Sequence, residues 1–484
     1  MINVKAISTN VGKALLISAL FMFISLMISI YEGMDSAFTP LLISFIITSI
    51  VGAFPFIFVK GPQPLTLKDG FITISLAWVL SFVFGMLPYV LWGGEFTIIN
   101  AWFESVSGYT TTGSTILNDI EALPRSLLFW RSSTHYIGGL GVIVFLLMVM
   151  PSASPYRLKL TNMELSSLSK EGYKYNSSKV VKVITTVYLG LTISACIALW
   201  AAGMPFFDSI NHAFSIAATG GFSTRNLSIG YFQSDLINFI AMIFMVVAAM
   251  HFGLIYAVFA TRSIKPMKNP VVMYYLASIV VMSLIVTFTL MGEGGYTSWG
   301  KALLDSSFNV VSYMSTTGFA INDNSTWPIL AGMILMLAGI QCGCSGSTTG
   351  GLKVDRILVI FKALRNELRR RLHPSSVSQV KMGGQYLPDS VVSSVFMYIV
   401  IYIVVIFLSI IAVMLCGSEP LEAISGVISS VGSVGPGLGD VASLDNYSAQ
   451  PVMSKLVFTF DMFLGRMEIF PILIVISLMF NRSK

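Results

Sequence analysis

"SGYTTTGS", residues 107–114, is a polar stretch with two glycines that stands between two long apolar segments. Three similar stretches follow it, and an alignment without gaps gives each an initial Ser and a Thr or Ser two positions before a Gly. These four stretches, called here the glycine segments, are SGYTTTGS (107–114), SIAATGGF (215–222), SYMSTTGF (312–319) and SSVGSVGP (429–436). The shared Gly is residue 113, 221, 318 or 435, a spacing that predicts an internal fourfold repeat.

The composition places the chain in a membrane. Of 484 residues, 55% are hydrophobic and 11% are charged, whereas a soluble domain has about 25% charged residues. Ten apolar runs are long enough, or nearly so, to cross a hydrocarbon core of about 30 Å as helices. The predicted spans are 13–31, 37–59, 71–92, 127–150, 181–203, 235–260, 271–292, 327–342, 391–416 and 452–480. We therefore expect an all-α, multi-pass membrane protein.

The charged residues predict its orientation. Ten spans put both termini on one side, and 23 of the 29 Lys and Arg residues fall on that side. The positive-inside rule makes that side cytoplasmic. Most of the 23 acidic residues fall on the other side. The net charge of +6 is thus explained by topology and anionic lipid, and it gives no reason to expect nucleic-acid binding.

The glycine segments all lie on the external side, between spans, and are too short to cross the membrane. A cation that enters a bilayer needs oxygen ligands in place of water, and backbone carbonyls can supply them where Gly permits the necessary dihedrals. A short helix before each segment, at 98–109, 206–217, 302–313 and 419–430, would aim its negative C-terminal end at the ion. The candidate ion ligands are Thr111, Thr112, Gly113, Thr219, Gly220, Gly221, Thr316, Thr317, Gly318, Ser433, Val434 and Gly435.

A simpler interpretation of one such segment is a re-entrant turn or a helix-packing motif, because small residues are frequent at helix interfaces in membranes. Four copies in register on one side favour an ion pathway instead. Each repeat would then consist of a helix, a pore helix, a filter strand and a second helix.

The eighth span is interrupted by GCSGSTTGGLK, residues 343–353, called here the 343–353 loop. Fifteen helical residues from Trp327 descend about 22 Å, so this break lies below the glycine segments and still within the membrane. It is either a glycine kink in a packed helix or a mobile plug across the ion path. As a plug, its gating residues would be Gly343, Gly346, Ser347, Thr348, Thr349, Gly350 and Gly351.

Arg466 is the one basic residue near the middle of an apolar span. Such a charge costs about 2.5–3.5 kcal/mol to insert, so a partner must compensate it. Glu468 points elsewhere on a continuous helix, which leaves carbonyl oxygens of residues 343–351 or pore water as partners. The alternative is a structural Arg paired with Asp461 or Glu468.

Other polar residues suggest no further site. Four cysteines (Cys196, Cys342, Cys344 and Cys416) and four histidines (His135, His212, His251 and His373) lack metal-ligand spacing, and we interpret them as packing or surface residues. The sequence 346–351 lacks the Lys-Ser/Thr of a phosphate-binding loop, and no nucleophile-base arrangement occurs. We expect no enzyme activity and no organic cofactor.

Residues 355–373, DRILVIFKALRNELRRRLH, form a predicted amphipathic helix with arginines off its apolar face. Such a helix is typical of the surface of anionic lipid. Because it continues from the 343–353 loop, it could also contact a cytosolic regulator or form a dimer contact.

The four ordered glycine segments and the topology resemble the superfamily of K⁺ transporters that contains TrkH, TrkG and KtrB, and through it the filter of K⁺ channels. The resemblance covers residues 68–484, and the two leading helices at 13–59 look like the TrkH/TrkG branch. It implies a pseudo-fourfold pore for K⁺ in the bacterial inner membrane. It also implies a plug at the 343–353 loop that is latched by Arg466, and control by a cytosolic nucleotide-binding subunit like TrkA.

One departure from the T-V-G-Y-G filter of K⁺ channels is clear, since only the fourth copy, Val434-Gly435-Pro436-Gly437, retains the second Gly of that pattern. This implies fewer ion sites and looser selectivity. We expect two leading helices (1–67) and four pore repeats (68–155, 156–262, 263–382 and 383–484), and a homodimer. A Na⁺-permeable relative, or the K⁺-binding subunit of a pump, is the alternative within transport. A membrane scaffold or receptor without conduction would make the four segments coincidental.

Overall fold

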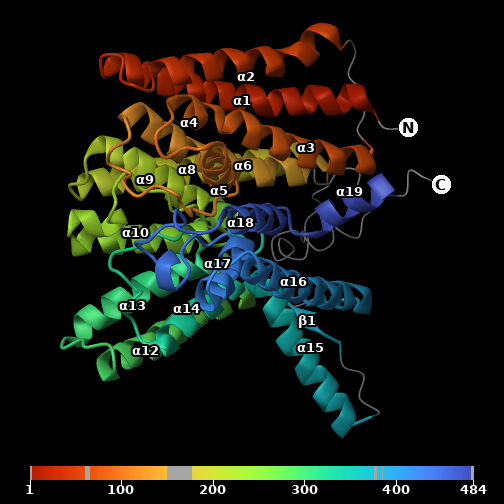
Figure 1. Cartoon of the computed structure of the whole chain (residues 1–484). Coiled ribbons are helices and arrows are strands. Elements are labelled where there is room, and N and C mark those ends of the chain that lie inside the picture. Colours follow the sequence, from red (N-terminus) through yellow and green to blue (C-terminus); the bar gives the residue numbers. More distant parts are fainter. Residues whose placement is uncertain (1–2, 60–65, 150–176, 375–378, 384, 481–484) are drawn as a thin grey trace.

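The computed structural model describes residues 3–59, 66–149, 177–374, 379–383 and 385–480, and almost all of its regular structure is helical (Figure 1). Within these residues one sheet occurs, a short antiparallel hairpin of β1 (Lys381–Met382) and β2 (Gln385–Tyr386). The all-α fold class predicted from the composition is confirmed.

Two leading helices are followed by four groups of similar build. The leading helices are α1 (Val4–Tyr31) and α2 (Phe38–Phe58). The first group contains α3 (Leu67–Gly85), α4 (Leu87–Trp92), α5 (Ile98–Tyr109) and α6 (Arg125–Val149). The second contains α8 (Ser177–Ala201), α9 (Phe206–Ala218), η2 (Ser228–Phe232), α10 (Asp235–Ala248), α11 (Phe252–Thr261) and η3 (Lys265–Lys268).

The third group contains α12 (Pro270–Gly292), α13 (Trp299–Met314), α14 (Ile329–Gln341) and α15 (Val354–Leu372). The fourth contains α16 (Asp389–Leu415), α17 (Pro420–Gly432), η4 (Gly439–Val441), α18 (Val452–Arg466) and α19 (Phe470–Phe480). The start of α1 and the end of α19 lie at the same end of the molecule, as both termini on one side requires (Figure 1).

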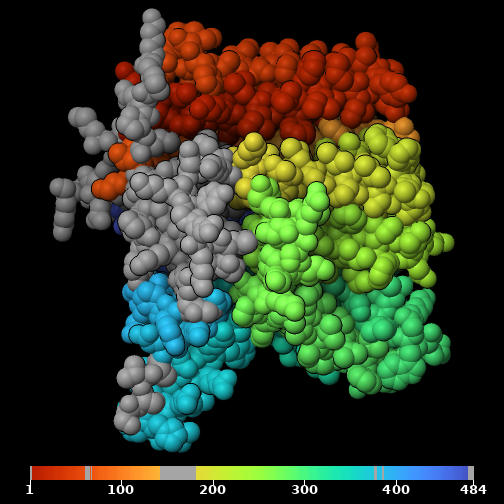
Figure 2. All heavy atoms as spheres, turned by 180° about the vertical axis from the view of Figure 1, so that it is seen from behind, coloured from red at the N-terminus to blue at the C-terminus, as the bar shows by residue number. Residues whose placement is uncertain are grey.

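The leading helices form an outer layer on one side of the bundle, which Figure 2 shows in red from behind. α1 packs on α2, α3 and α6. The two leading helices approach closely because glycines face each other: a Cβ on Gly12 would lie 2.6 Å from the carbonyl oxygen of Gly52. Much of α2 is exposed, as a lipid-facing helix would be.

Four short helices, α5, α9, α13 and α17, match the predicted pore helices to within three residues at either end. They have 12, 13, 16 and 13 residues, and at 1.5 Å per residue none is long enough to span a bilayer. The last two turns of each are almost wholly buried. They therefore dip into the centre of the protein and stop there.

The groups are arranged in a closed ring. The helix that follows each glycine segment packs on the short helix of the next group, in the pairs α6 with α9, α10 with α13, α14 with α17, and α18 with α5. The last pair closes the ring, since α18 belongs to the fourth group and α5 to the first. The four C-terminal ends of the short helices are thereby brought to one axis.

Each predicted span overlaps helix, but three spans are not single helices. Residues 71–92 divide into α3 and α4 at Met86, and residues 235–260 divide into α10 and α11, which are bent by 100°. Residues 452–480 divide into α18 and α19 around Glu468 and Ile469, whose φ angles are positive. By length and composition six described helices could cross a membrane, and the bent pair makes a seventh. Hydropathy located these breaks poorly because the residues around them are themselves apolar.

Helix α15 leaves the bundle next to the start of α16 and projects beyond it (Figure 1). Only Val354 and Val359 of its residues are buried. Its apolar residues Phe361, Leu364, Leu368 and Leu372 are at least half exposed. The predicted amphipathic helix is present, and its apolar face is uncovered in a single chain.

Candidate functional site

The four glycine segments share one backbone conformation, which starts where each short helix ends. The fifth residue of each segment has a left-handed conformation with φ of 54–55°: Thr111, Thr219, Thr316 and Ser433. The N–H of the next residue then donates to the carbonyl of the initial Ser, at 2.8–3.0 Å, in the pairs Thr112–Ser107, Gly220–Ser215, Thr317–Ser312 and Val434–Ser429. This helix-ending motif satisfies carbonyls that the helix leaves unpaired. The alignment made from sequence is therefore also an alignment of structure.

The shared glycines form a second ring inside the ring of helices. Their φ angles of 72–106° suit Gly alone: Gly113, Gly221, Gly318 and Gly435. A Cβ added to each would meet a carbonyl oxygen of the neighbouring segment, namely Gly220 O, Thr317 O, Val434 O and Thr112 O in that order. The order is cyclic and closes on the first segment. The twelve predicted ligand residues are thus brought together at one axis.

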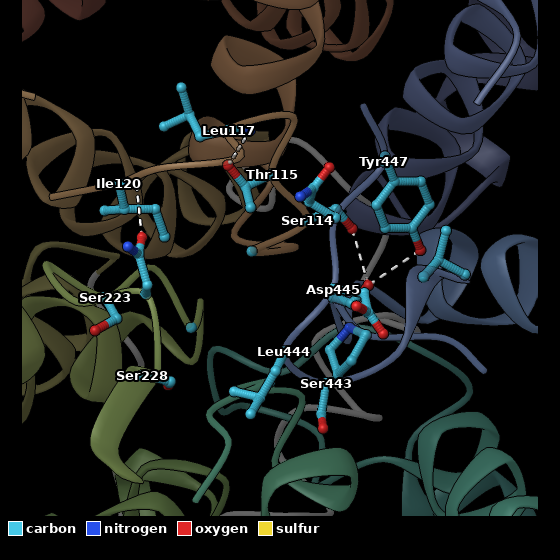
Figure 3. A pocket seen from close by; sticks show the side chains of 18 of the residues that line it. Ser114, Thr115, Leu117, Ile120, Ser223, Ser228, Ser443, Leu444, Asp445 and Tyr447 are labelled. Atoms are coloured by element: carbon cyan, nitrogen blue, oxygen red, sulfur yellow. Dashed lines mark hydrogen bonds between the residues drawn. The ribbon is translucent and has the colours of Figure 1, made fainter. Parts of the chain in front are cut away.

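Above these glycines the chain forms an open pocket that all four of them line (Figure 3). Its other lining residues are mostly polar. The hydroxyls of Ser114 and Tyr447 donate to Gly435 O at 2.9 and 3.1 Å. The bond from Ser114 joins the first segment to the fourth. Burial, together with the negative charges of Asp323 and Asp440, raises the pKa of the Asp445 carboxyl in this pocket.

Below the glycine segments lies the 343–353 loop. Residues Cys342 to Lys353 separate α14 from α15 and form no helix. Thr348 Oγ1 donates to Ala217 O at 3.1 Å, and Gly350 N donates to Thr316 Oγ1 at 3.3 Å. A Cβ on Gly350 would collide with Gly432 O. The loop therefore contacts the ends of three short helices, directly under the glycine ring.

The bend between α10 and α11 accommodates this loop. A broken helix leaves backbone groups unpaired, and in a membrane they need protein partners. Cys344 N donates to Ala249 O at 2.9 Å, and Phe252 N donates to Gly346 O at 3.1 Å. Inside the loop, Ser347 Oγ donates to Cys344 O and is bonded to Thr349 Oγ1. Gly343 O accepts from Val354 N, and Gly351, with φ of 65°, packs on Cys342.

Arg466 joins the loop to the first group of helices. Its guanidinium donates to Thr348 O through Nη1 and to Gly138 O through Nη2, at 2.5 and 3.3 Å, and the residue is 4% exposed. The alternative of a pair with Asp461 or Glu468 does not occur. Asp461 accepts from Ser409 Oγ.

We expected Glu468 to point away from Arg466 because both would lie on one continuous helix. That reason is wrong, since α18 ends at Arg466. Glu468 lies in the break and pairs instead with Lys353 at 3.2 Å and Arg356 at 2.8 Å. These contacts tie the start of α15 to the fourth group.

Sequence reasoning missed several residues behind the glycine segments. His135 and His212, interpreted as packing or surface residues, are fully buried. His135 is hydrogen-bonded to Gly108 O of the first segment and Phe222 N of the second, and His212 to Ser223 Oγ. Glu104 and Arg131 form a buried ion pair beside them. A signal was present, since Glu104 and Arg131 are charged residues in apolar surroundings, as Arg466 is.

The comparisons agree with this architecture. The model of the TrkH family, described as a cation transport protein, matches residues 39–484. The chain is 34% identical to the Trk system potassium uptake protein TrkH of Salmonella typhimurium, over 86% of each chain. It is 32% identical to the Trk system potassium uptake protein TrkG of Escherichia coli K12, over 99% of each. The crystal structure of the potassium transporter TrkH from Vibrio parahaemolyticus superposes with a TM-score of 0.88 at 31% identity, over 98% of each chain.

The glycine ring predicts a strong difference between two Gly→Ala substitutions. Gly221→Ala should destabilise the fold by about 1–3 kcal/mol, because the residue is left-handed and its Cβ would collide with Thr317 O. Gly190→Ala is the control, since Gly190 lies in α8 with nothing near its Cβ. It should leave the melting temperature in detergent unchanged or slightly raised. Equal melting temperatures for the two variants would contradict the ring geometry.

Proposed function

The chain belongs to the TrkH family of cation transport proteins, and from this premise we propose that it carries K⁺ into the cell through a channel-like pore. Members of such a family transport ions and are not enzymes. The observation that carries the proposal is the closed ring of four glycine segments at the axis of the molecule. K⁺ is the transported ion, and the chain itself binds no organic cofactor.

The glycine segments act as the selectivity filter. Carbonyl and hydroxyl oxygens of Thr111, Thr112, Gly113 and their counterparts in the other three segments replace the hydration shell of K⁺. Two features support this assignment: the four segments meet in cyclic order, and the negative ends of four short helices point to the same place. The pore repeats begin near residues 68, 156, 263 and 383, after two leading helices, and the boundary at 156 lies outside the described residues.

The 343–353 loop acts as the gate below the filter. Residues Gly343 to Gly351 obstruct the path, and Arg466 holds the loop in place through Thr348 O. The positive charge of Arg466 also opposes a cation beneath the filter. The support for this role is positional, because the loop contacts three of the four short helices and has no regular structure of its own.

The protein functions in the bacterial inner membrane with both termini in the cytoplasm. A cytosolic nucleotide-binding subunit resembling TrkA controls the gate through α15, which continues directly from the 343–353 loop. The exposed apolar face of α15 contacts lipid or a second copy of the chain in a homodimer.

The filter proposal predicts cation preference. Flux into liposomes that contain the purified chain should be faster with K⁺ or Rb⁺ than with Na⁺ or Li⁺. Gly113→Ser should weaken that preference, because a side chain there meets Gly220 O and displaces a ligand carbonyl. Equal K⁺ and Na⁺ flux through the unmodified protein would favour a Na⁺-permeable relative. No flux without an added ATPase would favour a pump subunit, and no flux under any condition would favour a scaffold.

The gate proposal predicts that two changes have the same effect. Deletion of residues 346–350 should raise K⁺ flux without altering ion preference, since the filter is untouched. Arg466→Ala should do the same, because it frees Thr348 O and removes a cation from the path. When the two changes are combined, their effects on K⁺ flux should not add, since both release the same closed state.

Thermal stability must be measured beside flux for both changes. If the loop is only a packing kink, the deletion should give misfolded protein, and Arg466→Ala should give folded protein with unchanged flux. Fully additive gains would indicate two separate barriers.

The homodimer proposal predicts that α15 controls oligomeric state. Leu364→Ser with Leu368→Ser should convert a detergent-solubilised dimer to monomer, because both side chains are more than half exposed in a single chain. Light scattering with correction for bound detergent measures the mass. An unmodified protein that is monomeric, or a double variant that stays dimeric, would exclude α15 as the contact.

A further inference from the structure

The junction between the first and second glycine segments contains a buried ion pair. Arg131 Nε on α6 lies 2.6 Å from Glu104 Oε1 on α5, and the two side chains are 2% and 0% exposed. Burial of two charges costs several kcal/mol per ion unless geometry and further hydrogen bonds compensate. Both side chains have such bonds, and these extend to the two neighbouring glycine segments.

Glu104 holds the chain that leaves the first segment. Its carboxylate accepts from Thr115 Oγ1 at 3.0 and 3.1 Å and from Ile116 N at 3.1 Å. These residues follow Gly113 by two and three positions. A displacement of Glu104 would therefore displace the exit of the first segment.

Arg131 holds the equivalent part of the second segment. Its Nη1 donates to Ser223 O at 2.9 Å, and its Cζ lies 3.5 Å from the centre of the Phe222 ring. Phe222 and Ser223 directly follow Gly221. A guanidinium over an aromatic face is attracted by the ring quadrupole, so Arg131 fixes both the backbone and a side chain of that segment.

His135, one turn below Arg131 on α6, completes the connection. Phe222 N donates to His135 Nε2 at 3.1 Å, so Nε2 carries no proton. In the neutral ring Nδ1 is then the donor, and its partner is Gly108 O at 2.7 Å. The ring also stacks on Phe222 with centroids 4.0 Å apart. One side chain thus joins the end of α5 to the second segment.

The other three junctions contain hydrogen bonds between neutral groups. Within the described residues, Ser228 Oγ accepts from Ala320 N at 3.2 Å between the second and third segments. Tyr313 OH donates to Gly437 O at 3.2 Å between the third and fourth. Tyr447 N donates to Thr115 O at 2.8 Å between the fourth and first. The pore is therefore asymmetric, because among the described ion pairs only Glu104–Arg131 has both side chains almost fully buried.

We propose that Glu104, Arg131 and His135, called here the brace, are positioning residues that set ion preference by fixing the first and second glycine segments relative to each other. The inference rests on the proposed function, because it assigns these residues to the same filter. A filter that is held at fixed width favours K⁺, and one that can contract accepts the smaller Na⁺ as well.

Four variants test the brace. Arg131→Met removes the guanidinium and leaves Glu104 unpaired, Glu104→Gln keeps the shape without the charge, and the double variant removes the pair together. His135→Phe keeps an aromatic ring and removes both hydrogen bonds. In liposomes, the ratio of K⁺ to Na⁺ flux should fall by about fivefold or more in Arg131→Met, which loses charged hydrogen bonds, and in His135→Phe, which loses two buried neutral ones. The double variant controls for misfolding, because it removes both charges and so leaves neither of them buried without a partner.

Lys455→Met is the matched control. Lys455 is 5% exposed and donates to Asn100 Oδ1 at 3.0 Å and Ser448 O at 2.9 Å, both outside the four glycine segments. Its loss should lower the melting temperature and leave the flux ratio unchanged. If the flux ratio falls as much in this control as in Arg131→Met, the effect of the brace is a general loss of stability, and the proposal is wrong.

Hydrogen exchange gives a second measure that does not depend on transport. In the double variant, amides in 107–118 and 215–226 should exchange about tenfold faster or more, as expected when charged hydrogen bonds are lost. Amides in 312–322 should keep their rates. Unchanged exchange in the first two regions would overturn the brace. An unmodified protein without K⁺ preference would overturn the proposed function, and the exchange rates would still decide whether the brace positions the segments.

Discussion

The structure depends on one constraint: backbone that leaves a helix inside a membrane must find partners within the protein. The glycine segments meet it by ending each short helix in the same way, with the N–H after the left-handed residue bonded to the carbonyl of an initial Ser. This pairs the N–H groups where each short helix ends. The glycines are needed because each Cβ position is occupied by the carbonyl of the next segment.

The same constraint explains the irregular parts of the third and second groups. The 343–353 loop pairs only part of its backbone within itself, and the bend between α10 and α11 leaves helix ends unpaired. Each supplies what the other lacks, through Cys344 N with Ala249 O and Phe252 N with Gly346 O. A change in the loop therefore also changes the bend. Arg466 adds the first group to this arrangement through Gly138 O.

Buried charge is placed unevenly around the axis. Arg466 lies below the ring, and its hydrogen-bond partners within the described residues are backbone carbonyls. Arg131 lies beside the ring and has Glu104 as its counter-ion. Glu468 pairs with Lys353 and Arg356 where α15 begins. Arg466, Arg131 and Glu468 each bond to a residue of another group, and they thereby help to specify one arrangement of four similar units.

By itself the sequence determined the class, the four repeats and the short helices, because hydropathy and the Ser-to-Gly spacing are local patterns that repeat. It also indicated the interruption at residue 343 and the need of Arg466 for a partner. It could not give the break after Arg466 or the bend at Met250, because both lie in apolar runs whose backbone is paired by distant residues. His135 was read as packing for the same reason. Its two hydrogen bonds join residues 27 and 87 positions away, and only the closed ring of helices brings those residues together.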